Sequence, residues 1–332
     1  MDLLPTVSKH LGDILTHAIE YAPDHEALVI YDTQAPLTRL LVDGYRKYLP
    51  PESFLDFAQT TPEDILERFK SLRRGDLVVL VQSSNFRLSE FRIRIELFKY
   101  GLKTIEHIHL GRISESQFPT YIDSLAYDPA YYRPRGKELK RRIDACHTIV
   151  VECPGTILVY ETPFEVAKLN IGDYTGMQNI GGTYPIGEVF SEPQDLVKVN
   201  GSIKIFAFAG KDHLIREYEP FTAVINAGIL SAPDAPQDFQ EILTMIEEDS
   251  SVIVREFGLG LNRAMGKGRL VNDLTAFERM CGMHMSLGAK HSIYKKPGMS
   301  RKEGRYHVDI FLDLERILID TKVVYQDGDF VV

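Results

Sequence analysis

The sequence predicts an α/β protein in which a doubly wound N-terminal α/β domain is followed by a β-rich α+β domain. In the first half, amphipathic helices alternate with short apolar segments, a pattern typical of a mostly parallel sheet. From Cys153 onward, short strands and turns predominate. Because 332 residues exceed the usual size of one domain, we expect two domains, residues 1–150 and residues 151–332.

The elements of the first half follow in a regular order. Apolar residues recur with helical spacing over 8–22, and the apolar run ALVIYD at 27–32 predicts a buried strand. A helix is expected over 36–47, and another begins after Thr61, a suitable N-cap residue, and ends before Gly75. The run DLVVLVQSS predicts a second strand, and the alternation continues through the helix KELKRRIDAC to the strand HTIVVEC.

Sheets of this kind often bind nucleotides through glycine-rich loops that hold the phosphate groups. Neither GxGxxG nor GxxxxGK followed by Ser or Thr comes after any apolar strand of the first half. We therefore expect no nucleotide cofactor in this domain.

The second half has a different texture. The segments PGTILVYETP, NIGGTYPIGEVF and GSIKIFAFAG combine apolar residues with turn formers and predict short strands. One helix is expected near 237–248. The closing segment ILIDTKVVYQDGDFVV predicts a β-hairpin.

The overall charge and the cysteine content exclude several classes of partner. Lys and Arg number 38 against 47 Asp and Glu, a formal net charge of −9, so we expect no nucleic-acid partner. The N-terminus has no basic region followed by an apolar stretch, and no segment reaches the length of a membrane span. Three widely spaced cysteines fit reduced thiols better than disulfides, so we expect a cytoplasmic protein that binds no membrane.

A segment near the C-terminus carries two side chains that are suitable metal ligands. In the run YHVDI, His307 and Asp309 face one side of the predicted strand, whereas Val308 and Ile310 face the other. An imidazole and a carboxylate held by rigid backbone are common ligands of divalent metals. The same pattern also occurs on the polar face of half-exposed strands, so the pair by itself does not define a site.

Three further residues place ionisable groups among apolar neighbours. His284 lies in MCGMHMSLG, and a buried imidazole needs a partner, either a metal or a hydrogen-bonding group in the core. Glu256 ends the apolar run SVIVREF, where we expect the strand to open into the glycine-rich loop GLGLN. Glu188 lies in YPIGEVF, either as a buried ligand or as the acid of a surface turn.

The blocks GEVFSEP, VREFGLGLN, CGMHMSLG and YHVDIF, taken in order, resemble the conserved blocks of the M29 family of metal-dependent aminopeptidases. The resemblance covers roughly residues 145–332 and fades in the N-terminal half. It implies a metal-binding catalytic domain that holds two divalent ions. Zinc is the metal we expect first, and cobalt or manganese are the alternatives. The implied ligands are Glu188, Glu256, His284, His307 and Asp309, separated by 68, 28, 23 and 2 residues. The implied reaction is removal of N-terminal residues from peptides or amino-acid amides.

The chain departs from the family pattern close to the first histidine ligand. Members have a tyrosine seven residues after it, whereas His291 stands at that place here and Tyr294 follows three residues later. The family's GTxH pattern is altered to CGMH. We expect the general base to be either a metal-bound carboxylate or a nearby acid such as Glu278, and we expect His291 or Tyr294 to donate a hydrogen bond to the tetrahedral oxyanion.

The segment between His284 and His307 is basic in an otherwise acidic chain. Its cations predict attraction of an anionic substrate group, although a solvated loop or a dimer contact is an equal alternative. They are Lys290, Lys295, Lys296, Arg301, Lys302 and Arg305. The family's members are commonly dimers, so the resemblance also implies a homodimer.

Two other functions compete with the aminopeptidase. The same fold family includes enzymes similar to 2,5-dihydroxypyridine dioxygenase, which open an aromatic ring with one iron held by two histidines and an aspartate. In those enzymes a histidine corresponds to Glu256, and no histidine corresponds to His284, so the sequence favours the hydrolase pattern. The third alternative is a metal-binding relative without catalytic activity.

Overall fold

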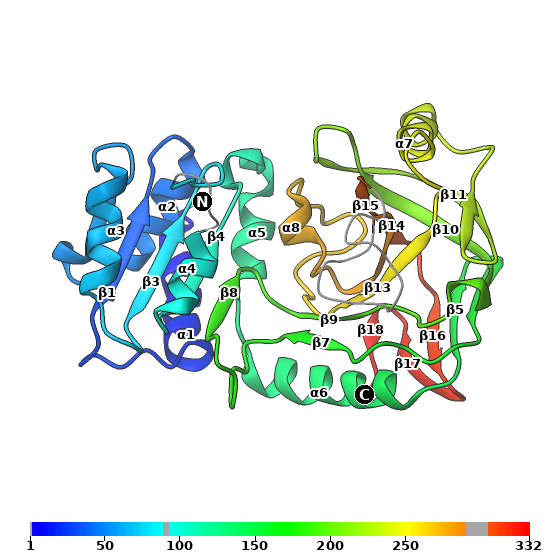
Figure 1. The fold of residues 1–332 in the computed structure, drawn as a ribbon, viewed down its shortest axis with the longest axis horizontal. Coiled ribbons are helices and arrows are strands. Elements are labelled where there is room, and N and C mark those ends of the chain that lie inside the picture. The colour runs from blue at the N-terminus through cyan, green and yellow to red at the C-terminus, as the bar shows by residue number, and fades with distance from the viewer. Residues whose placement is uncertain (1, 89–92, 290–304) are drawn as a thin grey trace. The chain divides into compact units, whose positions relative to one another are not determined.

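The computed structural model describes residues 2–88, 93–289 and 305–332. The chain forms two compact units (Figure 1). Unit 1 comprises Met1–Arg133 and Gly172–Ile186, and unit 2 comprises Pro134–Ile171 and Gly187–Val332. The division falls inside a long helix, and a short segment returns to unit 1 after the chain has entered unit 2. The folding boundary at residue 150 stays a prediction.

Unit 1 is built on a parallel sheet. Its strand order is β2-β1-β3-β4-β8, and every neighbouring pair is parallel. The central strand β3 is buried at all five positions, as expected for a sheet with both faces covered. The strands are β1 (Ala27–Tyr31), β2 (Phe54–Asp56), β3 (Leu77–Val81), β4 (Lys103–His107) and β8 (Gly181–Thr183).

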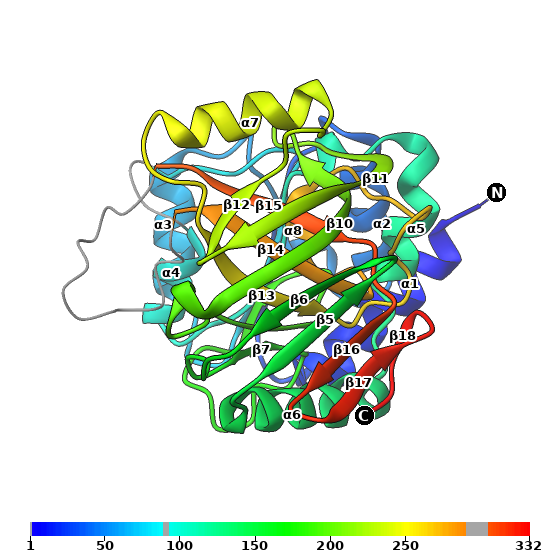
Figure 2. The same cartoon turned by 90° about the vertical axis from the view of Figure 1, so that its right-hand side faces the viewer.

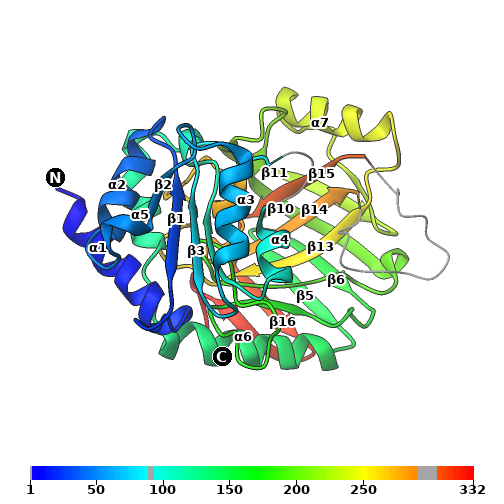
Figure 3. The same ribbon diagram turned by 60° about the vertical axis from the view of Figure 1, so that its left-hand side comes forward.

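Helices cover both faces of this sheet, with α3 and α4 on one side and α1, α2 and α5 on the other (Figure 3). Thr61 caps α3 as predicted, because its hydroxyl accepts a hydrogen bond from the Asp64 backbone N–H at 3.1 Å. The helices are α1 (Leu4–Asp13), α2 (Pro36–Tyr45), α3 (Pro62–Ser71), α4 (Ile93–Lys99), α5 (Phe118–Ser124) and α6 (Pro129–Ala145). Shorter helical turns are Ile14–Ala18, Pro51–Ser53, Leu110–Arg112 and Glu115–Gln117.

One strand of the first half belongs to a different sheet from the one expected. The run HTIVVEC forms β5 (Ile149–Cys153), which pairs antiparallel with strands of unit 2. Its positions alternate between buried and half-buried, which suits a sheet with one solvated face. The place in the parallel sheet is taken by β8, where Gly181 passes so close to Thr104 that a Cβ would lie 1.8 Å from the Thr104 carbonyl oxygen.

Unit 2 is dominated by a large antiparallel sheet, in which β10, β6 and β5 run side by side (Figure 2). The strand order is β18-β17-β16-β5-β6-β10-β15-β14-β13-β9-β7, with β11 and β12 branching from β10. The remaining strands are β6 (Thr156–Tyr160), β7 (Lys168–Asn170), β9 (Glu188–Ser191), β10 (Val199–Ala209), β11 (Ile215–Asn226), β12 (Ile229–Ser231), β13 (Val254–Gly260), β14 (Gly282–Gly288), β15 (His307–Leu312), β16 (Arg316–Ile319), β17 (Lys322–Gln326) and β18 (Asp329–Phe330).

Two helices and a helical turn accompany this sheet. The helix expected near 237–248 is α7 (Gln237–Glu247); the others are α8 (Leu274–Phe277) and the turn Leu196–Lys198. The closing hairpin is confirmed, because β16 pairs antiparallel with β17, and β17 with β18. All three cysteines are free thiols. Within the described ranges, no helix is both long and apolar enough to cross a membrane.

Candidate metal centre

Four neighbouring strands of unit 2 carry the five predicted ligands. Across β9, β13, β14 and β15, Gly260 pairs with Glu188, Gly258 with His284, Ser286 with Asp309, and Gly288 with His307. Residues that pair directly across an antiparallel ladder point to the same face of the sheet. Glu256 joins this face through its backbone N–H, which donates to the Ser286 hydroxyl at 3.0 Å.

The opposite face of the same strands is apolar and belongs to the core. Phe257 pairs with Met285, and Met285 with Ile310, all of them fully buried. One expectation about Glu256 was wrong, because it does not end its strand. The backbone continues as β13 through Gly260, with every position buried. The glycines expected to form a loop therefore lie inside the strand.

Glycine on the ligand face leaves room for the imidazole of His284. A Cβ placed on Gly258 would lie 2.1 Å from Cε1 and 2.2 Å from Nε2 of His284. No real side chain tolerates such a contact, so the ring occupies the space that a side chain at position 258 would fill. The phenyl ring of Phe311 lies against the imidazole at 5.9 Å between centroids.

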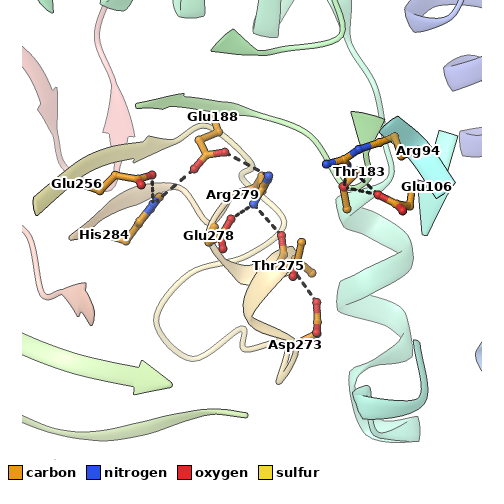
Figure 4. A network of polar contacts seen from close by, with 11 residues as sticks. Arg94, Glu106, Thr183, Glu188, Glu256, Asp273, Thr275, Glu278, Arg279 and His284 are labelled. Atoms are coloured by element: carbon orange, nitrogen blue, oxygen red, sulfur yellow. Dashed lines mark hydrogen bonds and ion pairs between the residues drawn. The ribbon is translucent and has the colours of Figure 1, made fainter. Parts of the chain in front are cut away.

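Glu188, Glu256 and His284 form a compact buried cluster of ligand atoms (Figure 4). Nε2 of His284 lies 3.5 Å from Oε1 of Glu188 and 3.6 Å from Oε1 of Glu256, and none of the three residues is more than 7% exposed. These separations exceed ordinary N–H···O distances. They match the roughly 3.4 Å between tetrahedral ligands that each lie about 2.1 Å from one ion. The three ligand atoms therefore fit a divalent metal.

The electrostatics of this cluster favour a cation. Burial alone would lower the pKa of His284, but the carboxylates of Glu256 and Glu188 raise it to about 9. Nδ1 of His284 is buried without a hydrogen-bond partner among the described residues, so Nε2 is the nitrogen directed at the carboxylates. A metal ion that binds here has to displace the imidazole proton.

His307 and Asp309 form a pair beside this cluster. Nε2 of His307 lies 3.2 Å from Oδ1 of Asp309, and Nδ1 lies 3.2 Å from the carbonyl oxygen of Ala289. Asp309 is buried, whereas the His307 side chain is 33% exposed. Burial would lower the pKa of His307, and the carboxylate of Asp309 raises it to about 10. That these two residues bind metal stays a prediction.

Glu278, the predicted general base, lies close to the cluster, and its role in a reaction stays a prediction. It follows α8, whose first turn is capped by Asp273, and its Oε2 accepts a hydrogen bond from Nη1 of Arg279. Burial is the main cause that raises the pKa of Glu278 to about 8, against the lowering effect of Arg279; the carboxylate of Glu188 adds to the rise. Near neutral pH this carboxyl group can therefore hold and release a proton.

Arg279 is a residue of this site that the sequence did not lead us to expect. Its Nη2 lies 3.2 Å from Oε2 of Glu188, and its side chain is nearly buried. A signal existed, because a charged residue within AFERMCGMHM stands among apolar neighbours and needs a buried partner. His291 and Tyr294 lie outside the described residues, as do the basic-segment residues other than Arg305.

Comparisons with known proteins show which solved structures share the fold that carries this site. No protein-family profile and no curated protein matches the sequence. Among solved structures, 2,5-dihydroxypyridine dioxygenase from Pseudomonas putida is similar over 98% of this chain and 97% of its own, with a TM-score of 0.63 and 12% identity. AmpT from Thermus thermophilus is similar over 99% of this chain and 100% of its own, with a TM-score of 0.60 and 14% identity. The chain shares the fold of both proteins.

These likenesses extend over both units. AmpT is an M29 aminopeptidase, so its likeness supports the fold that the sequence resemblance implied. It also covers the N-terminal half, where the sequence resemblance fades. Because both identities are low, the likenesses show the architecture and do not select one reaction.

Proposed function

We propose that this chain is a metal-dependent hydrolase of the aminopeptidase type, which removes N-terminal residues from peptides or amino-acid amides. The observation that carries the proposal is the buried cluster of Glu188, Glu256 and His284, with the protonatable Glu278 beside it. The order of these residues along the chain matches the ligand order that the M29 resemblance implies.

The ion would be held by Oε1 of Glu188, Oε1 of Glu256 and Nε2 of His284, with His307 and Asp309 as further ligands. When bound, a divalent ion supplies Lewis-acid chemistry that polarises the scissile carbonyl and acidifies a water molecule. Oxygen and nitrogen ligands without thiolate suit zinc, and also cobalt or manganese.

The protein's own groups would handle the protons. Because Arg279 binds Oε2 of Glu278, Oε1 is the oxygen that takes a proton from the attacking water and passes it to the leaving amine. The carbonyl oxygen of Ala289, 3.2 Å from Nδ1, orients the ring of His307 and leaves Nε2, beside Asp309, as the nitrogen that would bind the ion. His291 and Tyr294 remain the predicted donors to the oxyanion.

A ring-cleaving dioxygenase is the second candidate, supported by the likeness to 2,5-dihydroxypyridine dioxygenase. A non-haem iron triad of that kind consists of two histidines and one carboxylate. The buried cluster here has two carboxylates and one histidine, which favours the hydrolase. A metal-binding relative without activity is the third outcome that an assay can return.

The deciding experiment strips the protein with a chelator and reloads it with zinc, cobalt, manganese or iron(II). Each form is assayed on aminoacyl amides and short peptides, with acidic and neutral residues compared, and on 2,5-dihydroxypyridine with oxygen uptake recorded. We expect amino-acid release that His284→Ala abolishes. Oxygen uptake with iron(II) alone would establish the dioxygenase instead, and no turnover on either panel would favour the inactive relative.

We further propose that the protein is a homodimer and that the basic segment attracts an anionic substrate group. Sedimentation as a monomer would contradict the first proposal. Equal KM values for acidic and neutral peptides would contradict the second.

A further inference from the structure

Arg279 brings a permanent positive charge into the carboxylate cluster. Its Nη2 lies 3.2 Å from Oε2 of Glu188, while Nη1 donates to Glu278 and, at 2.8 Å, to the carbonyl oxygen of Thr275 (Figure 4). The side chain is 9% exposed. A guanidinium group does not lose its proton in proteins, so this charge is present at any working pH.

The two oxygens of Glu188 have different partners. Oε1 lies 3.5 Å from Nε2 of His284, on the side of the ligand cluster, whereas Oε2 faces Nη2 of Arg279. A carboxylate that bridges two metal ions through both of its oxygens gives one oxygen to each ion. With one oxygen bound to a guanidinium, Glu188 has one left and can serve a single ion.

The other acid that could complete a second ion's shell is Glu278, whose Oε2 binds Arg279 and whose Oε1 is assigned to proton transfer. Glu278 binds Arg279, and this leaves His307 and Asp309 as the remaining pair among the described residues near the cluster. Two protein ligands are fewer than the three that metal sites in enzymes commonly have. Glu188, Glu256 and His284 supply three for the first ion.

The charges in and beside the cluster also favour one metal ion over two. Four carboxylates lie in or beside the cluster, those of Glu188, Glu256, Glu278 and Asp309, and one guanidinium lies among them. With neutral imidazoles and all four carboxylates ionised, three negative charges remain, and one divalent ion neutralises two of them. A second ion would reverse the sign of the charge in a buried place next to a fixed cation.

We propose that Arg279 takes the place of a second metal ion, so that the chain binds one divalent ion where the M29 resemblance implies two. The inference rests on the proposed metal-dependent function, but it concerns the number of ions and not the reaction. Arg279 then also holds Glu278 in position.

The test counts metal ions in the whole chain. Wild type and variants are stripped, saturated with zinc or cobalt(II), freed of excess metal and measured by elemental analysis against protein concentration. We expect one equivalent in the wild type and two in Arg279→Met, which removes the charge at similar length. Arg279→Lys, which keeps a cation, should bind one. The matched control is Arg216→Met, which removes an exposed arginine paired with Asp212 and should also bind one.

Two equivalents in the wild type, or one in a folded Arg279→Met protein, would overturn the inference. Should Arg279→Met fail to fold, Arg279→Gln takes its place, because it removes the charge and keeps a hydrogen-bonding group toward Glu188 and Glu278. Two equivalents in this variant support the proposal, and one contradicts it. A wild type with one ion but no peptide hydrolysis would refute the aminopeptidase while supporting the single-ion site.

Discussion

Gly258 pairs with His284 across β13 and β14, and the imidazole lies over the glycine where a side chain would otherwise stand. A Cβ at position 258 would come within 2.1 Å of the ring. The ring's position, between the carboxylates of Glu188 and Glu256, therefore depends on the absence of a side chain one strand away.

Replacing this glycine should damage the metal site more than the fold. We expect Gly258→Ala to displace the imidazole and to weaken zinc binding by about 10–100-fold, with a stability loss of about 1–3 kcal/mol. Gly266→Ala is the control, since a Cβ there meets nothing within 4 Å. Calorimetric titration with zinc measures the affinities; equal affinity in both variants would show that the ring does not need this space.

Metal loading should stabilise the folded protein. An ion that binds only the native state adds about 2.7 kcal/mol to the free energy of unfolding when its free concentration is 100 times Kd. We expect zinc to raise the Tm of the wild type and chelator to reverse the rise. In His284→Ala, which lacks a central ligand, zinc should leave the Tm unchanged; a similar rise in both proteins would place the ion elsewhere.

Glu278 should matter for turnover and little for ion binding. We expect Glu278→Gln to lower kcat about 10²–10⁴-fold, the usual contribution of a general base, while the metal content stays that of the wild type. Glu247→Gln, an exposed change at the end of α7, should leave kcat unaltered. A kcat equal to wild type in Glu278→Gln would remove this residue from the mechanism.

Asp76 of unit 1 should make stability depend on acid pH. Burial would raise its pKa, but hydrogen bonds from the Arg73 and Glu26 backbone N–H groups and the contact with His25 hold it below the ordinary 3.8. A depressed pKa contributes stability above the unfolded value, and this contribution is lost as the pH falls through the folded pKa. The window therefore lies below about pH 4.

Urea unfolding of Asp76→Asn tests this expectation. The variant should lose about 1–3 kcal/mol at neutral pH, because an amide group places a donor against the Arg73 N–H. Its deficit relative to wild type should shrink as the pH is lowered through that window. Asp43→Asn, which breaks an exposed pair with Arg46, should change stability by less than about 0.5 kcal/mol. A deficit that does not vary with pH would contradict the assigned role of the carboxylate.

Most elements of the fold were readable because each has a local signal. Thr61 marks the start of α3, and the apolar run of β3 shows burial on both faces. The partner of a strand has no such signal. The run HTIVVEC reads as one more strand after a helix, and only its long-range pairing with β6 and β16 assigns it to the antiparallel sheet.

The sequence likewise predicted only those features of the candidate site that have a local signal. The alternation around His307 and Asp309 identifies residues that share a strand face, and this depends on local geometry alone. The approach of Arg279 to Glu188 depends on how the segment after α8 folds back over the ligand face, which no local pattern encodes. The role of Gly258 is likewise a property of two paired strands and cannot be seen in one.

The distribution of the ligands over β9, β13, β14 and β15 also affects how the protein is made. β9 and β13 pair although they lie far apart in the sequence, and antiparallel pairings between distant segments form slowly. Of the four strands, β15 is synthesised last. Until then the nascent chain carries Glu188 and Glu256 without the strand that completes the ligand face of the sheet. On the proposed metal site, a chain truncated before β15 would keep Glu188, Glu256 and His284 but would lack the strand that pairs with β14 and the His307–Asp309 pair that it carries.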